Sequence, residues 1–104
     1  MQYKIVITPT ASKQLENYFM YTADVLKNPV AAKAIISDAR NTKNELTNLA
    51  GSLPYCDNPK LKSQGYKKIE FLKHDFYMVF RVVEDKAVVE GMFHALQDYE
   101  NALR

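Results

Sequence analysis

One long amphipathic segment between residues 29 and 50, followed by three strand-like runs, constrains the fold of this chain most. Small and apolar side chains recur in the segment at alternating steps of three and four residues, namely Ala32, Ile35, Ala39, Thr42, Leu46 and Leu49. Such a stripe buries one face of a helix against a neighbouring element. Asn28-Pro29 starts this helix, because proline suits a first helical turn, and Gly51 is the residue type that commonly follows a helix end. We therefore predict a helix over residues 29–50.

The residues before this helix predict a strand and a first helix. Tyr3, Ile5 and Ile7 alternate with the other side chains of residues 2–8, which is the period of a strand. Thr8-Pro9-Thr10 ends the strand, and the apolar spacing over residues 15–26 is helical. The second helix is thus expected to lie against the first, in an antiparallel hairpin, or against the sheet.

The residues after the second helix predict a three-stranded meander. Residues 51–65 contain Gly, Pro and Asn with little periodicity and are expected to form a loop. Strands are predicted over residues 66–72, 76–83 and 86–94, with a tight turn at Glu84-Asp85. Asp98 is expected to cap a short helix over residues 99–103. The order β-α-α-β-β-β-α predicts an α+β fold in which an antiparallel meander packs on an α-helical hairpin.

Length and composition exclude several classes of protein. A chain of 104 residues accommodates one hydrophobic core, so we predict a single domain over residues 1–104. Its 47% hydrophobic and 25% charged residues exclude intrinsic disorder. One cysteine cannot form an internal disulfide, which favours a reducing compartment. No apolar run approaches the length of a membrane span, and the expected location is the cytoplasm.

No sequence motif for a cofactor or a metal ion is present. The chain lacks a Gly-rich phosphate loop, a GxSxG motif, an HExxH motif and a CxxC pair. His74 and His94 have no flanking ligand pattern, and Cys56 lies in a loop with nothing nearby to activate it. We therefore expect neither a cofactor nor a metal site.

The net charge of +2 conceals one basic stretch over residues 60–73. That stretch holds a single acid, Glu70, against five lysines, which are Lys60, Lys62, Lys67, Lys68 and Lys73. A local basic patch attracts polyanions even when the whole protein is nearly neutral. The alternative is a strand edge kept soluble by lysines. On the first interpretation, exchanging Lys67 and Lys68 for Glu should weaken binding far more than it lowers stability.

Alternation along the predicted strands places polar side chains on an open face of the sheet. In residues 76–83, Tyr77 and Arg81 share one face with Val79, and the opposite face is wholly apolar and should meet the helices: Phe76, Met78, Phe80 and Val82. In the last strand Glu90, Met92 and His94 are expected to share a face. With Lys67 and Lys68 beside them, the open face would gather cations, a histidine and tyrosines.

This set of side chains suits contact with RNA. Cations bind phosphates and phenol rings stack on unpaired bases. His94 would transfer a proton and Arg81 would stabilise a phosphorane during metal-independent RNA cleavage. The alternatives are structural: His94 as a satisfied strand-end residue, Tyr77 as a half-buried sheet aromatic, and Arg81 as a rim charge paired with Glu84 or Glu90.

Five segments of the chain together resemble the RelE/ParE superfamily of bacterial toxins from type II toxin–antitoxin modules. The similar segments are the opening Tyr3-Lys4-Ile5-Val6-Ile7-Thr8-Pro9-Thr10-Ala11, the helix start Asn28-Pro29-Val30-Ala31-Ala32, Gly65-Tyr66-Lys67-Lys68-Ile69 followed by Asp75-Phe76-Tyr77-Met78-Val79-Phe80-Arg81-Val82, and the ending His94-Ala95-Leu96-Gln97-Asp98-Tyr99-Glu100-Asn101-Ala102-Leu103. That ending is similar to the family pattern H-G-x-x-D-(Y/W)-x-x-L-L. The segments occur in the family's order and cover nearly the whole chain.

The resemblance implies a small toxin held inactive by a cognate antitoxin, whose chain would cover the basic stretch or the aromatic face. RelE-like members cut mRNA in the ribosome, and ParE-like members poison DNA gyrase. Tyr77 stands where RelE-like nucleases carry a catalytic Arg, Gln97 stands where many relatives are basic, and His94 matches a histidine of some nucleases. The paired helices and the Asn-Pro-x-Ala-Ala start are closer to the ParE side.

Three functional hypotheses follow. The first is a gyrase poison; the second is a ribosome-dependent mRNA endonuclease that uses His94, Arg81 and Tyr77; the third is an inactive member that binds its antitoxin and, through that complex, operator DNA. The residues expected to bind the target or RNA are Lys62, Lys67, Lys68, Lys73, Gln97 and Tyr99.

Overall fold

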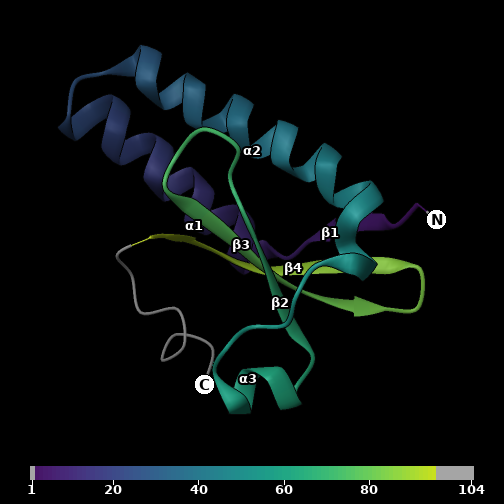
Figure 1. Cartoon of the computed structure of the whole chain (residues 1–104). Coiled ribbons are helices and arrows are strands. Elements are labelled where there is room, and N and C mark those ends of the chain that lie inside the picture. Colours follow the sequence, from purple (N-terminus) through teal and green to yellow (C-terminus); the bar gives the residue numbers. More distant parts are fainter. Residues whose placement is uncertain (1, 96–104) are drawn as a thin grey trace.

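Four strands form one mixed sheet with both long helices on the same face, in a computed structural model that describes residues 2–95 (Figure 1). The strands are β1 (Lys4–Ile7), β2 (Tyr66–Glu70), β3 (Phe76–Val83) and β4 (Lys86–His94). Their spatial order is β1-β4-β3-β2, in which β1 runs parallel to β4 and the other neighbours are antiparallel. The predicted α+β class and the meander are thus confirmed. The helix predicted over residues 99–103 lies outside the described residues.

The helices begin at the capping residues that the sequence supplies. In α1 (Pro9–Met20) the Thr8 hydroxyl accepts a hydrogen bond from the Ala11 N–H at 3.2 Å. A π-helical turn, η1 (Tyr21–Val25), extends α1, and α2 (Pro29–Leu49) then begins where the Asn28 side chain accepts from the Ala31 N–H at 3.0 Å. In the described part of the chain, neither long helix is apolar enough to cross a membrane.

The predicted loop over residues 51–65 contains two short helices. A 3-10 turn, η2 (Ala50–Ser52), continues α2, and α3 (Pro59–Ser63) forms where the Asn58 side chain accepts from the N–H groups of Lys60 and Leu61. The Asn-Pro pair therefore starts a helix here, as it does at the beginning of α2. The loop prediction is wrong over residues 59–63, because it did not take Asn58-Pro59 as the start of a helix.

The main core lies between the helices and one face of the sheet. The predicted stripe on α2 is buried from Ala32 to Leu46, and it meets Met78, Phe80 and Val89 of the sheet. The prediction that Leu49 belongs to the buried stripe is wrong, because this residue is 39% exposed. Ala50 is buried in its place. Ala50 follows Leu46 by four residues, which keeps it on the helix face that packs on the sheet.

A second, smaller cluster covers part of the opposite face of the sheet. The segment that contains α3 crosses this face, and its buried members with the strand residues beneath are Cys56, Leu61, Tyr66, Val79 and Phe93. The outer face is consequently only partly open. Its accessible portion lies beside this cluster and forms the site described next.

Candidate functional site

The outer face of the sheet, turned away from α1 and α2, carries Tyr77 and Arg81 as the alternation predicts. Both side chains are partly exposed, whereas Phe76, Met78 and Phe80 lie in the main core. Val79 shares the outer face but is fully buried beneath the α3 segment. The prediction that this face is turned outward is therefore confirmed for Tyr77 and Arg81. The prediction that the whole face is open is wrong, because Val79 between them is covered.

Arg81 is held by a carboxylate that a β-bulge brings to the same face. Val79 pairs with Gly91 but Phe80 pairs with Val89, so Glu90 is an extra residue in β4. Arg81 Nε donates to Glu90 Oε2 at 2.5 Å, and the guanidinium lies 5.1 Å from the ring centre of Tyr66. This is one of the two ion pairs that the sequence left open for Arg81. Its positive charge is largely compensated within the protein.

The same cluster shifts two pKa values. The hydrogen bond to Glu90 raises the pKa of Arg81 further above its already high value. Burial, reinforced by the Glu90 charge, raises the pKa of Tyr66. The Tyr66 hydroxyl lies 3.5 Å from Glu90 Oε1 and donates to it. Both groups therefore keep their protons throughout the physiological range and do not act as general bases.

A second cation of this face is Lys68, which is partly exposed and lies over Tyr77. The Lys68 ammonium is 4.9 Å from the Tyr77 ring centre, which is a cation–π distance. Lys68 pairs with Val79 across β2 and β3, so its side chain emerges on the outer face. Of the two adjacent lysines in β2, only this one reaches the predicted surface.

His94 lies on the other face of the sheet, which corrects the predicted grouping. It pairs with Phe76 across β3 and β4, and their ring centres are 5.2 Å apart. The His94 N–H donates to the Tyr18 hydroxyl at 3.2 Å, on the α1 side. The bulge at Glu90 breaks the period of two in β4, so Glu90 does not share a face with Met92 and His94. The sheet therefore separates His94 from Arg81 and Tyr77.

The prediction that Lys67 lies on the open face is also wrong, because the residue is only 7% exposed and its side chain points to the helix side. It pairs with the core residue Phe80, and its ammonium donates to the Gly51 carbonyl at 3.1 Å. Tyr55 lies over it, with the ammonium 4.6 Å from the ring centre. Adjacent residues of a strand face opposite sides, so Lys67 cannot join Lys68 on the outer face.

The two lysines are accordingly expected to behave differently when each is replaced by Glu. Lys67→Glu should lower the free energy of unfolding by about 2 kcal/mol, because it places a carboxylate in a buried site facing a carbonyl. Lys68→Glu should change it by no more than about 0.5 kcal/mol. Urea denaturation of the single variants measures both values. Equal losses would contradict the assignment of Lys67 to the interior.

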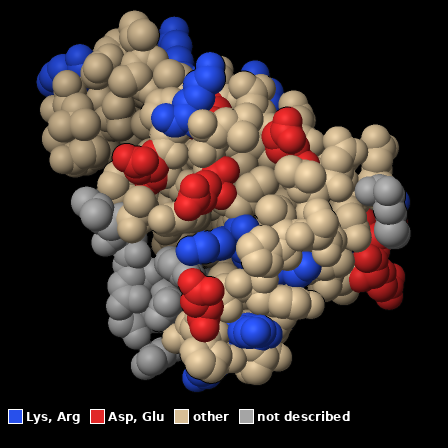
Figure 2. Space-filling view, viewed as in Figure 1, with Lys and Arg blue, Asp and Glu red and all other residues tan. Residues whose placement is uncertain are grey.

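The remaining lysines of the basic stretch do not form one patch. Lys62 is exposed on α3 and Lys73 is exposed in the loop after β2, so the five residues of β2 lie between them, about 17 Å of strand. Figure 2 shows acidic side chains among the basic ones on the visible face. Gln97 and Tyr99, also expected to contact the target, lie outside the described residues.

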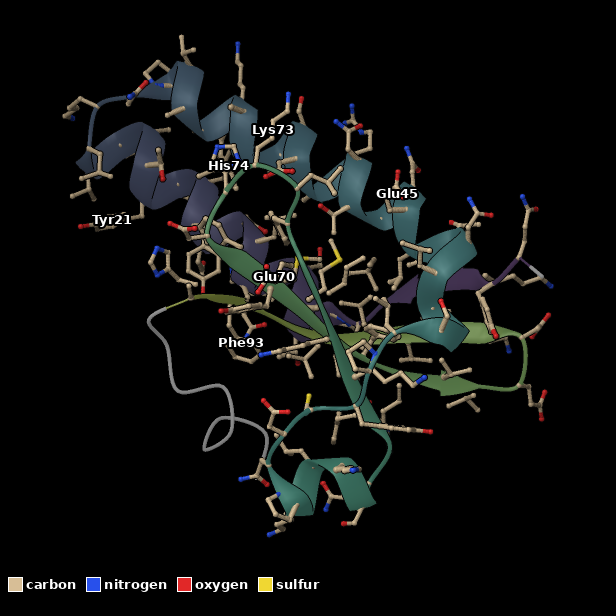
Figure 3. The ribbon with its side chains drawn as sticks, viewed as in Figure 1. Tyr21, Glu45, Glu70, Lys73, His74 and Phe93 are labelled. Atoms are coloured by element: carbon tan, nitrogen blue, oxygen red, sulfur yellow. The ribbon has the colours of Figure 1, made fainter. Side chains whose placement is uncertain are left out.

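A buried aspartate missed at the sequence level fixes the loop between β2 and β3. Asp38 of α2 is 2% exposed, and its carboxylate accepts from the N–H groups of Leu72 at 3.1 Å and Lys73 at 3.0 Å. His74 Nδ1 lies 2.6 Å from Asp38 Oδ2 and donates to it. Figure 3 labels His74 and Lys73 of this loop. The available signal was its position between Ile35 and Thr42, three and four residues away on the buried stripe.

Burial alone would raise the pKa of Asp38, but the hydrogen bonds outweigh that effect. The donors from His74 and from the backbone of Lys73 stabilise the carboxylate, and the net result is a lowered pKa. Within residues 2–95, no group of three or more His, Cys, Asp or Glu side chains is arranged to hold a metal ion. The hydrogen bonds from Leu72, Lys73 and His74 make Asp38 a connection between α2 and the loop.

Solved structures with a similar fold exist, although no family model matches the sequence and no curated protein matches it. A chain of the chromosomal ParDE toxin–antitoxin system from P. aeruginosa has a TM-score of 0.74 at 17% identity, covering 89% of this chain and 96% of that chain. A chain of the toxin–antitoxin complex RelBE2 from Mycobacterium tuberculosis has a TM-score of 0.58 at 13% identity, covering 90% of this chain and 99% of that chain. This chain therefore has the RelE/ParE fold.

Proposed function

We propose that this protein is the toxin of a toxin–antitoxin module and that it stops growth by binding its target, DNA gyrase, rather than by cutting RNA. The observation that carries the second half of the proposal is the division of the candidate nuclease residues between two faces. His94 packs on Phe76 on the helix side, whereas Tyr77 and Arg81 lie on the outer side. A general base must reach the same substrate as the group that stabilises the transition state.

The state of Arg81 supports the same proposal. Its guanidinium is paired with Glu90 and lies 5.1 Å from the ring centre of a phenol, Tyr66. A phosphate approaching Arg81 would have to displace the carboxylate and would meet its negative charge. The outer face is thus a poor site for stabilising a phosphorane. The higher TM-score to the ParDE chain agrees with a ParE-like role.

An antitoxin as partner is supported by the apolar end of the helical hairpin. A groove of about 750 Å³ opens there between α1, η1, α2 and the sheet, and its lining includes Tyr18, Tyr21, Phe76 and His94. Large apolar side chains around the same end of the hairpin are exposed: Met20, Tyr21, Val25, Leu26 and Val30. Contiguous exposed apolar surface of this kind marks an interaction site. Operator DNA would be contacted through the antitoxin complex.

The proposal is tested by inducing the chain with and without its antitoxin. Induction alone should arrest growth, and co-expression of the antitoxin should restore it. The purified chain should trap gyrase–DNA cleavage complexes in a supercoiling assay, and His94→Ala should retain both effects because His94 takes no part. Arrested cells with cut mRNA, untouched gyrase and a harmless His94→Ala variant would instead establish the RelE-like nuclease. Uneventful growth on induction would contradict any toxin activity.

A further inference from the structure

A cavity on the helix side of the sheet places hydrogen-bond donors around the buried ammonium of Lys67. The cavity has a volume of about 320 Å³, and its lining is Tyr3, Gly51, Tyr55, Gly65, Lys67 and Val82. No acidic residue is among these. It lies where the end of α2 meets the start of β1, since the Tyr3 N–H donates to the Thr47 carbonyl at 2.9 Å.

Lys67 has donor capacity that the protein does not use. An ammonium has three N–H donors, and one of them reaches the Gly51 carbonyl. Within residues 2–95 no carboxylate forms an ion pair with Lys67, and the Tyr55 ring is its other described contact. A cation that is 7% exposed and lacks a carboxylate partner is costly to bury. A bound anion would relieve that cost.

The two phenols of the cavity add further donors. Neither the Tyr3 hydroxyl nor the Tyr55 hydroxyl has a hydrogen-bond partner among the described residues. Tyr3 reaches this position because residue 51 is glycine: a Cβ built on Gly51 would lie 2.1 Å from Tyr3 Oη. The glycine therefore makes room for the Tyr3 hydroxyl at the same residue whose carbonyl accepts from the ammonium. Donors from three side chains and one buried positive charge are the features of a site for an oxyanion.

We propose that this cavity, the Lys67 pocket, binds a small oxyanion such as a phosphate or a carboxylate group. The ammonium supplies the charge and two donors, and the Tyr3 and Tyr55 hydroxyls supply one donor each. The site is separate from the outer face, because Lys67 pairs with the core residue Phe80. It does not depend on the proposed toxin activity.

The proposal is tested by titrating the full-length chain with inorganic phosphate, with acetate and with chloride at matched ionic strength. The NMR signals of the Lys67 ε-methylene should shift in a saturable manner with phosphate or acetate and not with chloride. Lys67→Met should reduce the affinity about tenfold or more, since it removes a charge-assisted contact. Lys68→Met, the adjacent lysine on the opposite face, should leave it unchanged.

A second pair of variants keeps the test valid if Lys67→Met unfolds. Tyr3→Phe and Tyr55→Phe retain the rings and remove only the hydroxyls, and each should weaken binding about threefold. Saturation by phosphate alone or by acetate alone would support the site and identify which group it prefers. An identical response to chloride, or affinities that none of the three pocket variants changes, would overturn the proposal.

Discussion

Replacing Asp38 with Ala should lower the free energy of unfolding by about 3 kcal/mol, the largest effect we expect from one polar substitution in this chain. The carboxylate is 2% exposed and accepts from two backbone N–H groups and from His74. Its removal leaves the Lys73 N–H and His74 without their acceptor in a partly buried loop, and leaves the Leu72 N–H with only the Thr42 hydroxyl, 3.3 Å away. Chemical denaturation measures the loss, and Asp57→Ala, at an exposed aspartate, is the matched control with a change within about 0.5 kcal/mol.

The loss should also be visible locally. Amide hydrogen exchange at Leu72 and Lys73 should accelerate in the Asp38→Ala variant more than exchange in the central strand β3, because the loop loses its attachment to α2. Unchanged protection of these two amides would contradict the connecting role of Asp38. It would place the stabilising effect of Asp38 elsewhere in the helix.

The pH dependence of the free energy of unfolding provides an independent test of the contribution of the Asp38 carboxylate. The folded-state pKa of Asp38 is lowered, so the carboxylate contributes stability that is fully present above its unfolded pKa of about 4. This contribution should decline as the pH falls below that value towards the folded pKa. Asp38→Asn cannot ionise and should flatten this part of the stability profile. An equally steep decline in the Asn variant would assign the acid sensitivity to other carboxylates.

Gly91→Ala should lower the free energy of unfolding by about 2 kcal/mol through overpacking. A Cβ built on Gly91 would lie 2.4 Å from Cε2 and 2.7 Å from Cζ of Phe93, whose ring is 3% exposed beneath the α3 segment. The ring cannot move away without disturbing Val79 and Leu61, which pack in the same cluster. Thermal denaturation should show the loss as a fall in Tm.

The double variant Gly91→Ala/Phe93→Leu tests the physical cause of that loss. A leucine removes the part of the ring that the new methyl group meets, so the double variant should be more stable than the sum of the two single changes predicts. Additive losses would show that the glycine is required for another reason, such as the conformation of the adjacent bulge.

Local patterns were sufficient to predict the two long helices, the four strands and the direction of the β3 side chains. Capping residues and hydrophobic periodicity depend only on residues that are close together in the sequence, as at Asn28 and in residues 76–83. The bulge at Glu90 was not predictable in this way, because an extra residue in one strand is defined only by its partner strand. Because of the bulge, Glu90 lies beside Arg81 on the outer face, and His94 lies on the helix side.

The burial of Lys67 and Asp38 was not predictable for a related reason. Both are charged residues at buried positions, and general preferences place lysine and aspartate at the surface. What retains them inside is a set of acceptors or donors supplied by segments far away in sequence, Gly51 for the lysine and residues 72–74 for the aspartate. Single-residue preferences carry no information about such partners.

The parallel pairing of β1 with β4 fixes the earliest moment at which the fold can be completed during synthesis. Lys4 stands opposite Lys86, so β1 has no partner strand until residues 86–89 have been made. The helical hairpin forms from contacts between neighbours and can precede this step, but the sheet cannot close. Ile5 and Ile7, which pack on the core, therefore lack their neighbours in β4 in every shorter nascent chain. The completed sheet appears only after translation has passed residue 94, because His94 pairs with Phe76 at the end of β4.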